Sequence, residues 1–265
     1  MSSSNFTPPP MSLDDVRRAI DGVDDALADL LQQRFGLTEQ VKSAKGGEPS
    51  PWLTPLRPAR EMEILRRLFS KVGGNLPPEL LVRLWRSILT ESSLRQSNIT
   101  VHVGKKLAQA MGHRLRIRDH FGRFAVEECR DDAQALVQVN ANPLDVCIVE
   151  TESNWVEPFM QGMGGKAQVI GVLPVVKDSD MPKLLVLGVA PAQATGEDET
   201  LLISKGSLPR DFSPQPVWQA KVASYRLSSL AGFFSEHESP LISLSRSNPG
   251  LGLKVAGRYA SAIEV

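Results

Sequence analysis

The sequence predicts a multidomain protein, with an all-helical segment over residues 12–98 followed by an α/β domain over residues 99–265. Three observations predict this division. Apolar residues recur at helical spacing as far as Asn98, and no convincing strand precedes that residue. Beyond it, short apolar runs are bounded by Pro and Gly, as strands usually are. Helical stretches separate these runs, and strands that alternate with helices are typical of an α/β domain.

The first expected element is one long helix from Ser12 to Lys45, about 50 Å in length at 1.5 Å per residue. Ser12 and Asp15 have the spacing of a capping box, and Gly46 and Gly47 end the pattern. A helix of this length needs a partner along its whole apolar face. That face is formed by Leu13, Val16, Ile20, Val23, Leu27, Leu30, Leu31 and Val41.

Two shorter helices are expected next. A Pro- and Gly-rich loop over residues 46–56 leads to a helix over Pro58–Val72, which Gly73 and Gly74 stop. Pro77 and Pro78 then open a third helix that runs to about Asn98, because proline is well tolerated in a first helical turn.

The elements expected in the α/β domain are short. Strands are predicted at 99–103, 115–118, 144–149, 169–176, 184–189 and 201–204, helices at 104–111, 131–139 and 228–237, and further elements at 241–245 and 253–256.

Composition argues against several classes of function. Thirty Lys and Arg balance thirty Asp and Glu, so no global field favours nucleic acid or a membrane surface. No run is long and apolar enough for a transmembrane helix. Residues 1–11 lack the pattern of a secretory signal and are expected to be a disordered tail. Cys129 and Cys147 are expected to be buried free thiols, which indicates a cytoplasmic protein. Neither they nor His102, His113, His120 and His237 have metal-ligand spacing.

The otherwise apolar helix faces carry polar residues, namely Arg17, Arg34, Lys45, Arg60, Glu61, Ser92 and Gln96. Four cations, a carboxylate, a hydroxyl and an amide suit a small dianion, since Arg pairs bidentately with carboxylates and Lys acts as a point charge. The alternative for the cations is that they snorkel, with apolar stems covering the core.

Helix length constrains such a site. Arg17 and Arg34 are about 25 Å apart along one rigid helix, too far for one small metabolite to touch both, whereas Arg34 and Lys45 are about 16 Å apart. Arg17 would therefore have to come from a second chain. An antiparallel pairing of two long helices would create two equivalent sites in a homodimer.

These spacings resemble the all-helical class of chorismate mutase. The resemblance covers about residues 12–98 and rests on R-x6-D at Arg17–Asp24, R-x6-V-x3-K at Arg34–Lys45, R-E at Arg60–Glu61 and S-x3-Q at Ser92–Gln96. It implies an intertwined dimer that converts chorismate to prephenate, in phenylalanine and tyrosine biosynthesis, by a concerted [3,3] rearrangement. No cofactor is implied.

The resemblance also implies a role for each position. Arg34 and the partner's Arg17 would grip the two carboxylates of the substrate. Lys45 and Gln96 would face the ether oxygen, and Glu61 would bind the ring hydroxyl as acceptor or, protonated, as donor. Arg60 and Ser92 would complete the polar contacts, and apolar walls would come from Val41, Ile64 and Leu89.

Two features depart from the family. Arg57 stands where an acidic residue is usual, and the loop after Lys45 is about three residues longer than in the familiar bacterial form. Two alternatives for the helical segment are an inactive dimerisation module and isochorismate pyruvate lyase, which shares the helical scaffold.

The second half faintly resembles prephenate dehydratase, to which the mutase is often fused. Residues 127–154 resemble a helix, strand and turn of that enzyme, but Glu152-Ser153-Asn154 has a changed order. The Thr-Arg-Phe motif would fall at Pro182-Lys183-Leu184, without the required threonine. A large part of the second lobe is also missing. This implies a truncated, non-catalytic domain that is a scaffold or a sensor of an aromatic amino acid effector.

Overall fold

The computed structural model describes residues 11–44 and 56–264, and for residues 41–44 it describes the backbone only. The chain divides into two compact units at residues 48/49. The domain boundary expected near residue 98 therefore lies inside the second unit. Residues 1–10 of the expected tail and most of the expected 46–56 loop lie outside the described residues.

The first unit contains helix α1, Leu13–Ala44, with 32 residues. This confirms the single long helix. Ser12 caps it: its Oγ accepts from the backbone N of Asp15 at 3.2 Å and donates to the Asp15 carboxylate at 2.6 Å. The two first-turn carboxylates, Asp14 and Asp15, suit the positive end of the helix dipole.

The second unit begins with two helices. Helix α2 spans Pro58–Val72 as expected, and Gly73 ends it in the left-handed conformation at φ +56°, which glycine adopts without steric cost. Helix α3 spans Pro78–Leu94. It ends four residues earlier than expected, so Gln96 lies in the turn that follows the helix.

The remaining elements form the α/β domain. Its helices are α4 Lys105–Gln109, α5 Met111–Phe121, α6 Asp132–Ala141, α7 Val156–Met160 and α8 Leu241–Ser247, with a 3-10 turn at Pro249–Leu251. Its strands are β1 Thr100–Gly104, β2 Ala125–Cys129, β3 Val146–Glu150, β4 Gln168–Leu173, β5 Leu184–Gly188, β6 Asp198–Ser204, β7 Pro216–Val222, β8 Tyr225–Ala231 and β9 Lys254–Ala260.

The strands form one mixed sheet in the order β2-β1-β3-β5-β4-β9-β6-β8-β7. Strand β9 joins its two halves, because it pairs in parallel with β4 and antiparallel with β6. At the junction Gly257 lies opposite Val169, and a Cβ on Gly257 would lie 2.1 Å from the Val169 carbonyl oxygen. Glycine is therefore required where these two strands approach each other.

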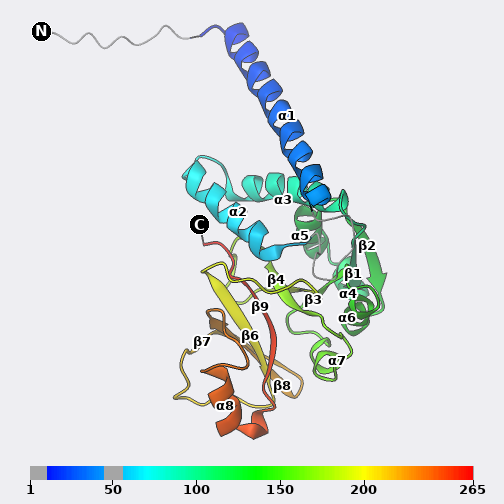
Figure 1. Ribbon diagram of the computed structural model, residues 1–265, viewed down its shortest axis with the longest axis vertical. Coiled ribbons are helices and arrows are strands. Elements are labelled where there is room, and N and C mark those ends of the chain that lie inside the picture. Colours follow the sequence, from blue (N-terminus) through cyan, green and yellow to red (C-terminus); the bar gives the residue numbers. More distant parts are fainter. Residues whose placement is uncertain (1–10, 45–55, 265) are drawn as a thin grey trace, which may run out of the picture. The chain divides into compact units, whose positions relative to one another are not determined.

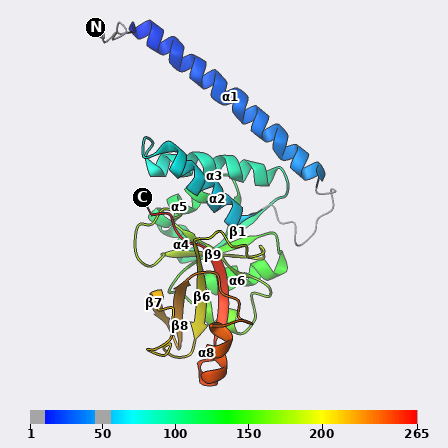
Figure 2. The ribbon, with the colours of Figure 1, turned by 60° about the vertical axis from the view of Figure 1, so that its left-hand side comes forward.

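Helices cover both faces of the β1–β5 half of the sheet (Figure 1). Helices α6 and α7 pack on one face through Leu136 and Phe159. Helix α5 packs on the other face through Phe121, in a cluster that also contains Leu65 of α2. Helix α8 covers the β6–β8 region through Leu241 (Figure 2). Helices α2 and α3 thus share a hydrophobic core with the α/β domain.

Two elements were predicted with the wrong secondary structure. The run Leu115–Arg118 is part of helix α5, not a strand, because Ile117 and Phe121, four residues apart, are buried together on one helical face. The run Ser228–His237 is not a helix: its first residues belong to β8, which is bonded to β6 on one side and β7 on the other. Pairing between distant strands overrides local helical spacing here.

Other expectations were incomplete. The single helix expected over 104–111 is α4, and the chain turns to extended backbone at Ala110 before α5 begins. The edge strands β2 and β7 were not predicted. The run Leu241–Ser245 belongs to helix α8 and the run Leu253–Ala256 begins strand β9.

Candidate functional site

The residues predicted for a dianion site fall on both compact units. On α1, the Arg17 guanidinium lies 3.4 Å from the Asp14 carboxylate, with 65% of its side chain exposed. Arg34 lies in the second half of the same helix. Val41 is helical, but its side chain and the whole of Lys45 lie outside the described residues.

Helix α1 carries its predicted apolar stripe in an exposed state. Seven of the eight predicted residues, all except Val41, have described side chains, and each of the seven is at least 37% exposed in the single chain. Leu37, which was not part of the prediction, is also exposed on this helix. An exposed apolar stripe of this extent is typical of an interaction surface. The exposed residues are Leu13, Val16, Ile20, Val23, Leu27, Leu30, Leu31 and Leu37.

Helix α2 presents its predicted polar pair in two environments. Arg60 is exposed and pairs with Glu63 one turn later, at 2.9 Å. Glu61 is buried, with 7% of its surface exposed, and pairs with Arg86 of α3. Ile64 is half-buried on the same helix.

Helix α3 and the turn that follows it hold the other predicted residues. Leu89 and Ser92 are buried. The Ser92 hydroxyl donates to the Ile88 carbonyl at 2.8 Å, and the Gln96 amide donates to the Ser92 carbonyl at 3.0 Å. The structure therefore holds five predicted residues on one packed helix pair and Gln96 in the turn that follows it, and it holds Arg17 and Arg34 in a separate unit.

Sequence reasoning missed Arg86. It is 3% exposed, and its Nε donates to the carbonyl of His120 in α5 at 2.9 Å. Burial, and secondarily the charge of Arg86, holds the pKa of His120 well below its usual range. The spacing along α3 could have identified Arg86, since it lies three residues before Leu89 and four after Val82, on the apolar face of the helix.

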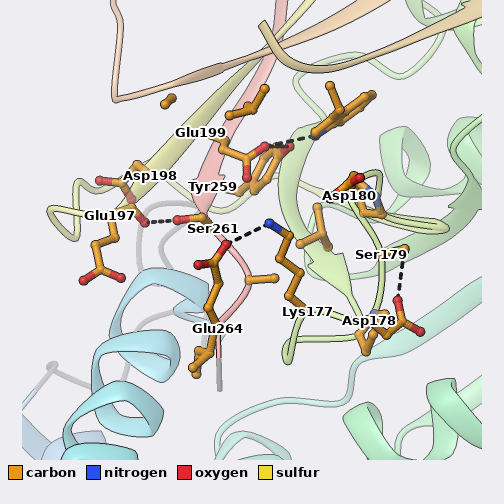
Figure 3. A pocket seen from close by; sticks show the side chains of 18 of the residues that line it. Lys177, Asp178, Ser179, Asp180, Glu197, Asp198, Glu199, Tyr259, Ser261 and Glu264 are labelled. Atoms are coloured by element: carbon orange, nitrogen blue, oxygen red, sulfur yellow. Dashed lines mark hydrogen bonds and ion pairs between the residues drawn. The ribbon is translucent and has the colours of Figure 1, made fainter.

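A cavity of about 670 Å³ lies in the α/β domain, where β9, β6 and the segment after β4 meet (Figure 3). One oxygen of Glu199 accepts from Trp218 at 3.0 Å, Ser229 at 2.5 Å and Tyr259 at 3.0 Å. Burial, followed by the negative charge of Glu199, raises the pKa of Tyr259 well above its usual range. Lys177 points across the cavity to Glu264, at 2.7 Å.

This cavity is acidic. Its lining includes Arg66 and Lys177 together with six carboxylates, those of Asp178, Asp180, Glu197, Asp198, Glu199 and Glu264. Asp198 is engaged locally, because it accepts from the backbone N and the hydroxyl of Thr195 at 2.8 Å each.

A smaller crevice of about 290 Å³ lies at the carboxyl ends of β1 and β3. It contains the Glu152-Ser153-Asn154 turn. Ser153 donates to the carboxylate of Asp132 at 2.5 Å, and Asn154 accepts from the backbone N of Ala133 at 3.3 Å. Burial raises the pKa of Asp132. The turn is therefore bound to the start of helix α6.

The described residues contain no group of three His, Cys, Asp or Glu side chains arranged to hold a metal ion. None of their helices has both the length and the apolar character needed to cross a membrane.

Residues 16–97 match the family model of chorismate mutase type II. This confirms the resemblance drawn from the spacing of the polar residues, and the matched range lies within the helical segment expected over residues 12–98. No curated protein sequence matches the chain.

Several solved structures are similar to the α/β part of the fold. One is described as GqqA, a novel type of quorum quenching acylase, with TM-score 0.41, 10% identity and coverage of 62% of this chain and 96% of that one. Prephenate dehydratase from Streptococcus mutans has TM-score 0.37, 12% identity and coverage of 64% and 100%. Prephenate dehydratase from Arthrobacter aurescens, in complex with L-Phe, has TM-score 0.39, 11% identity and coverage of 62% and 90%. These likenesses assign no activity to residues 99–265.

Proposed function

We propose that the protein is a chorismate mutase, which isomerises chorismate to prephenate. The observation that carries the proposal is the family match over residues 16–97, together with the polar residues that the family pattern requires on three helices. A concerted rearrangement needs neither nucleophile nor cofactor. It needs the substrate held in its compact form and charge stabilised at the breaking ether bond.

In this proposal the working unit is a homodimer. The 32-residue helix α1 carries an exposed apolar stripe along its length, and a second copy of α1 is the partner that fits it. Because Arg17 and Arg34 are about 25 Å apart on one helix, each site takes Arg17 from the partner chain. Arg34 and the partner's Arg17 bind the two carboxylates.

The other residues complete the site. Lys45 and Gln96 face the ether oxygen, and Glu61 binds the ring hydroxyl. Arg60 and Ser92 add polar contacts, and Val41, Ile64 and Leu89 form apolar walls. Arg57, exposed just before α2, replaces an acidic group, so the contacts around the ring hydroxyl differ from those usual in the family.

We further propose that residues 99–265 have no catalytic role and act as a scaffold or a regulatory domain. The cavity beside Glu199 supports the regulatory form, because its volume of about 670 Å³ lies in the usual range for small-molecule sites. An aromatic amino acid is the candidate effector. Its ammonium group would face the carboxylates, and its ring would lie against Trp218.

One assay of the full chain tests the activity. Chorismate loss is followed with and without acid conversion of prephenate. Isochorismate is supplied in a parallel reaction, and pyruvate is measured in both reactions. The mutase consumes chorismate and yields prephenate without pyruvate. Pyruvate from isochorismate would instead identify a lyase, and a dimer that consumes neither substrate would identify an inactive dimerisation module.

A further inference from the structure

Arg86 lies where three helices of the second unit meet. It projects from the middle of α3, and its Nη1 pairs with the carboxylate of Glu61 in the first turn of α2. Its Nε donates to the main-chain carbonyl of His120, next to the last residue of α5. One guanidinium therefore connects a predicted substrate-binding carboxylate to a helix of the α/β domain.

Both contacts suit the chemistry of arginine. Carbonyls in the last turn of a helix lack partners within that helix, and a cation is favoured at this end of the helix dipole. The planar guanidinium can donate to the His120 carbonyl and to Glu61 at the same time, because its N–H groups are held in a rigid plane. A lysine ammonium lacks this rigid arrangement of donors. The ion pair is deeply buried, since Glu61 and Arg86 are 7% and 3% exposed.

The apolar surroundings of the Arg86–Glu61 ion pair favour one fixed geometry of the contact. A small cavity of about 40 Å³ beside it is lined by apolar side chains, including those of Leu56, Met62 and Phe121. With little water to compete, a charge-assisted hydrogen bond holds its geometry more strongly than it would at the surface. The orientation of Glu61 thus depends on the position of Arg86, and that position depends on the end of α5.

We propose that Arg86 is a positioning residue of the mutase site, which orients Glu61 and couples that orientation to helix α5 of the α/β domain. This inference rests on the proposed function, in which Glu61 binds the ring hydroxyl of the substrate. It gives the α/β domain a positioning role and no catalytic one, because a displacement of the α5 terminus is passed through one guanidinium to Glu61.

Arg83 provides a matched control. It lies on the same helix and also pairs with α5, through Asp119 at 3.2 Å, but its side chain is 60% exposed. Arg83→Met therefore removes a cation and an α3–α5 ion pair without touching Glu61. If contact between α3 and α5 mattered only for stability, Arg83→Met and Arg86→Met would differ in melting temperature and agree in kcat/KM.

The experiment measures kcat, KM and melting temperature for the full-length wild type, Arg83→Met, Arg86→Met, Arg86→Lys, Glu61→Gln and the double variant Glu61→Gln/Arg86→Met. Arg86→Met is expected to lower kcat/KM by about 10- to 100-fold, the scale for a misplaced catalytic contact. Arg86→Lys is expected to recover part of that loss, and Arg83→Met to match the wild type. In the Glu61→Gln background, Arg86→Met is expected to cause little further loss, because the two residues act as one unit.

Two results would overturn the inference in an active enzyme. One is a kcat/KM for Arg86→Met equal to that of Arg83→Met, and the other is losses that multiply in the double variant. If Arg86→Met does not fold, Arg86→Lys measured alone and in the Glu61→Gln background supplies the same comparison. A wild type without mutase activity would refute the proposed function itself, and this outcome is distinct from an active enzyme that is indifferent to Arg86.

Discussion

The guanidinium of Arg66 in helix α2 donates to the main-chain carbonyl of Ser261, just after strand β9, at 2.9 Å. The same side chain donates to the hydroxyl of Thr195 and to the carbonyl of Glu197, at 2.8 Å each. Only 16% of the Arg66 side chain is exposed. A helix inside the mutase-like segment is thus anchored to the carbonyls of Glu197 and Ser261, which are 131 and 195 residues away in the sequence. These contacts explain why α2 belongs to the same compact unit as the sheet.

The first prediction concerns this anchor. Arg66→Met should lower the free energy of unfolding of the second unit by about 2 kcal/mol, because hydrogen bonds from a charged donor are each worth about 1.5–3 kcal/mol and some will be replaced by water. Urea denaturation followed by circular dichroism measures the change. Arg67→Met, at the exposed neighbouring position, is the control. Equal stability of the two variants would contradict the anchoring role.

A second prediction concerns the cations of α1. Arg34→Ala or Lys45→Ala should reduce mutase activity by at least about 100-fold, since each removes a positive charge that would stabilise the dianionic substrate during the rearrangement. The apolar stripe is unchanged, so gel filtration should still show a dimer. Arg18→Ala, which removes an exposed cation paired with Asp15, should keep its activity. Full activity in either site variant would refute the site assignment.

Mixing two inactive variants tests whether the site is shared between chains. Arg17→Ala and Arg34→Ala are each damaged at both sites of the dimer. After subunit exchange, half of the dimers are mixed, and each mixed dimer has one intact site if Arg17 acts in trans. Activity should recover to about a quarter of the wild-type value. A mixture that stays inactive after exchange, verified by mass spectrometry, would argue for a site within one chain.

A fourth prediction concerns the candidate effector. If an aromatic amino acid occupies the cavity beside Glu199, then phenylalanine, tyrosine or tryptophan should change the mutase rate and raise the melting temperature, because a ligand that binds only the folded state stabilises it. Glu199→Gln should weaken the effect by removing the charge that faces the ammonium group. No change in either quantity with all three amino acids would leave the domain as a scaffold.

The two cysteines give a fifth prediction, based on pH. Burial raises the pKa of Cys147 far above its usual value and also raises the pKa of Cys129. Since the thiolate is the reactive form, alkylation of Cys147 by iodoacetamide should stay negligible from about pH 7 to pH 9 in the folded protein. When the protein is unfolded in urea before alkylation, mass spectrometry should show both thiols modified. Rapid labelling of native Cys147 would mean that it is exposed by local opening.

Local sequence determined the elements whose ends are marked chemically. Ser12 begins α1, Pro58 begins α2 and Gly73 ends it, each through a backbone preference that acts within one turn. The buried strands β3 and β5 were also predictable, because they read as unbroken apolar runs. Spacing along the helices was enough to identify the family pattern, since 3.6 residues per turn place residues on a face regardless of what covers that face.

Tertiary structure decided what meets each face. Ser228 belongs to a strand because β6 and β7 supply hydrogen-bond partners from distant positions, and no local pattern encodes such partners. The same limit explains Arg86. Its place on the apolar face of α3 could be read from the sequence, but its contacts with Glu61 and with the His120 carbonyl exist only once α2, α3 and α5 are packed together. Helical periodicity specifies which side chains point inward, whereas long-range packing alone selects the partners they find.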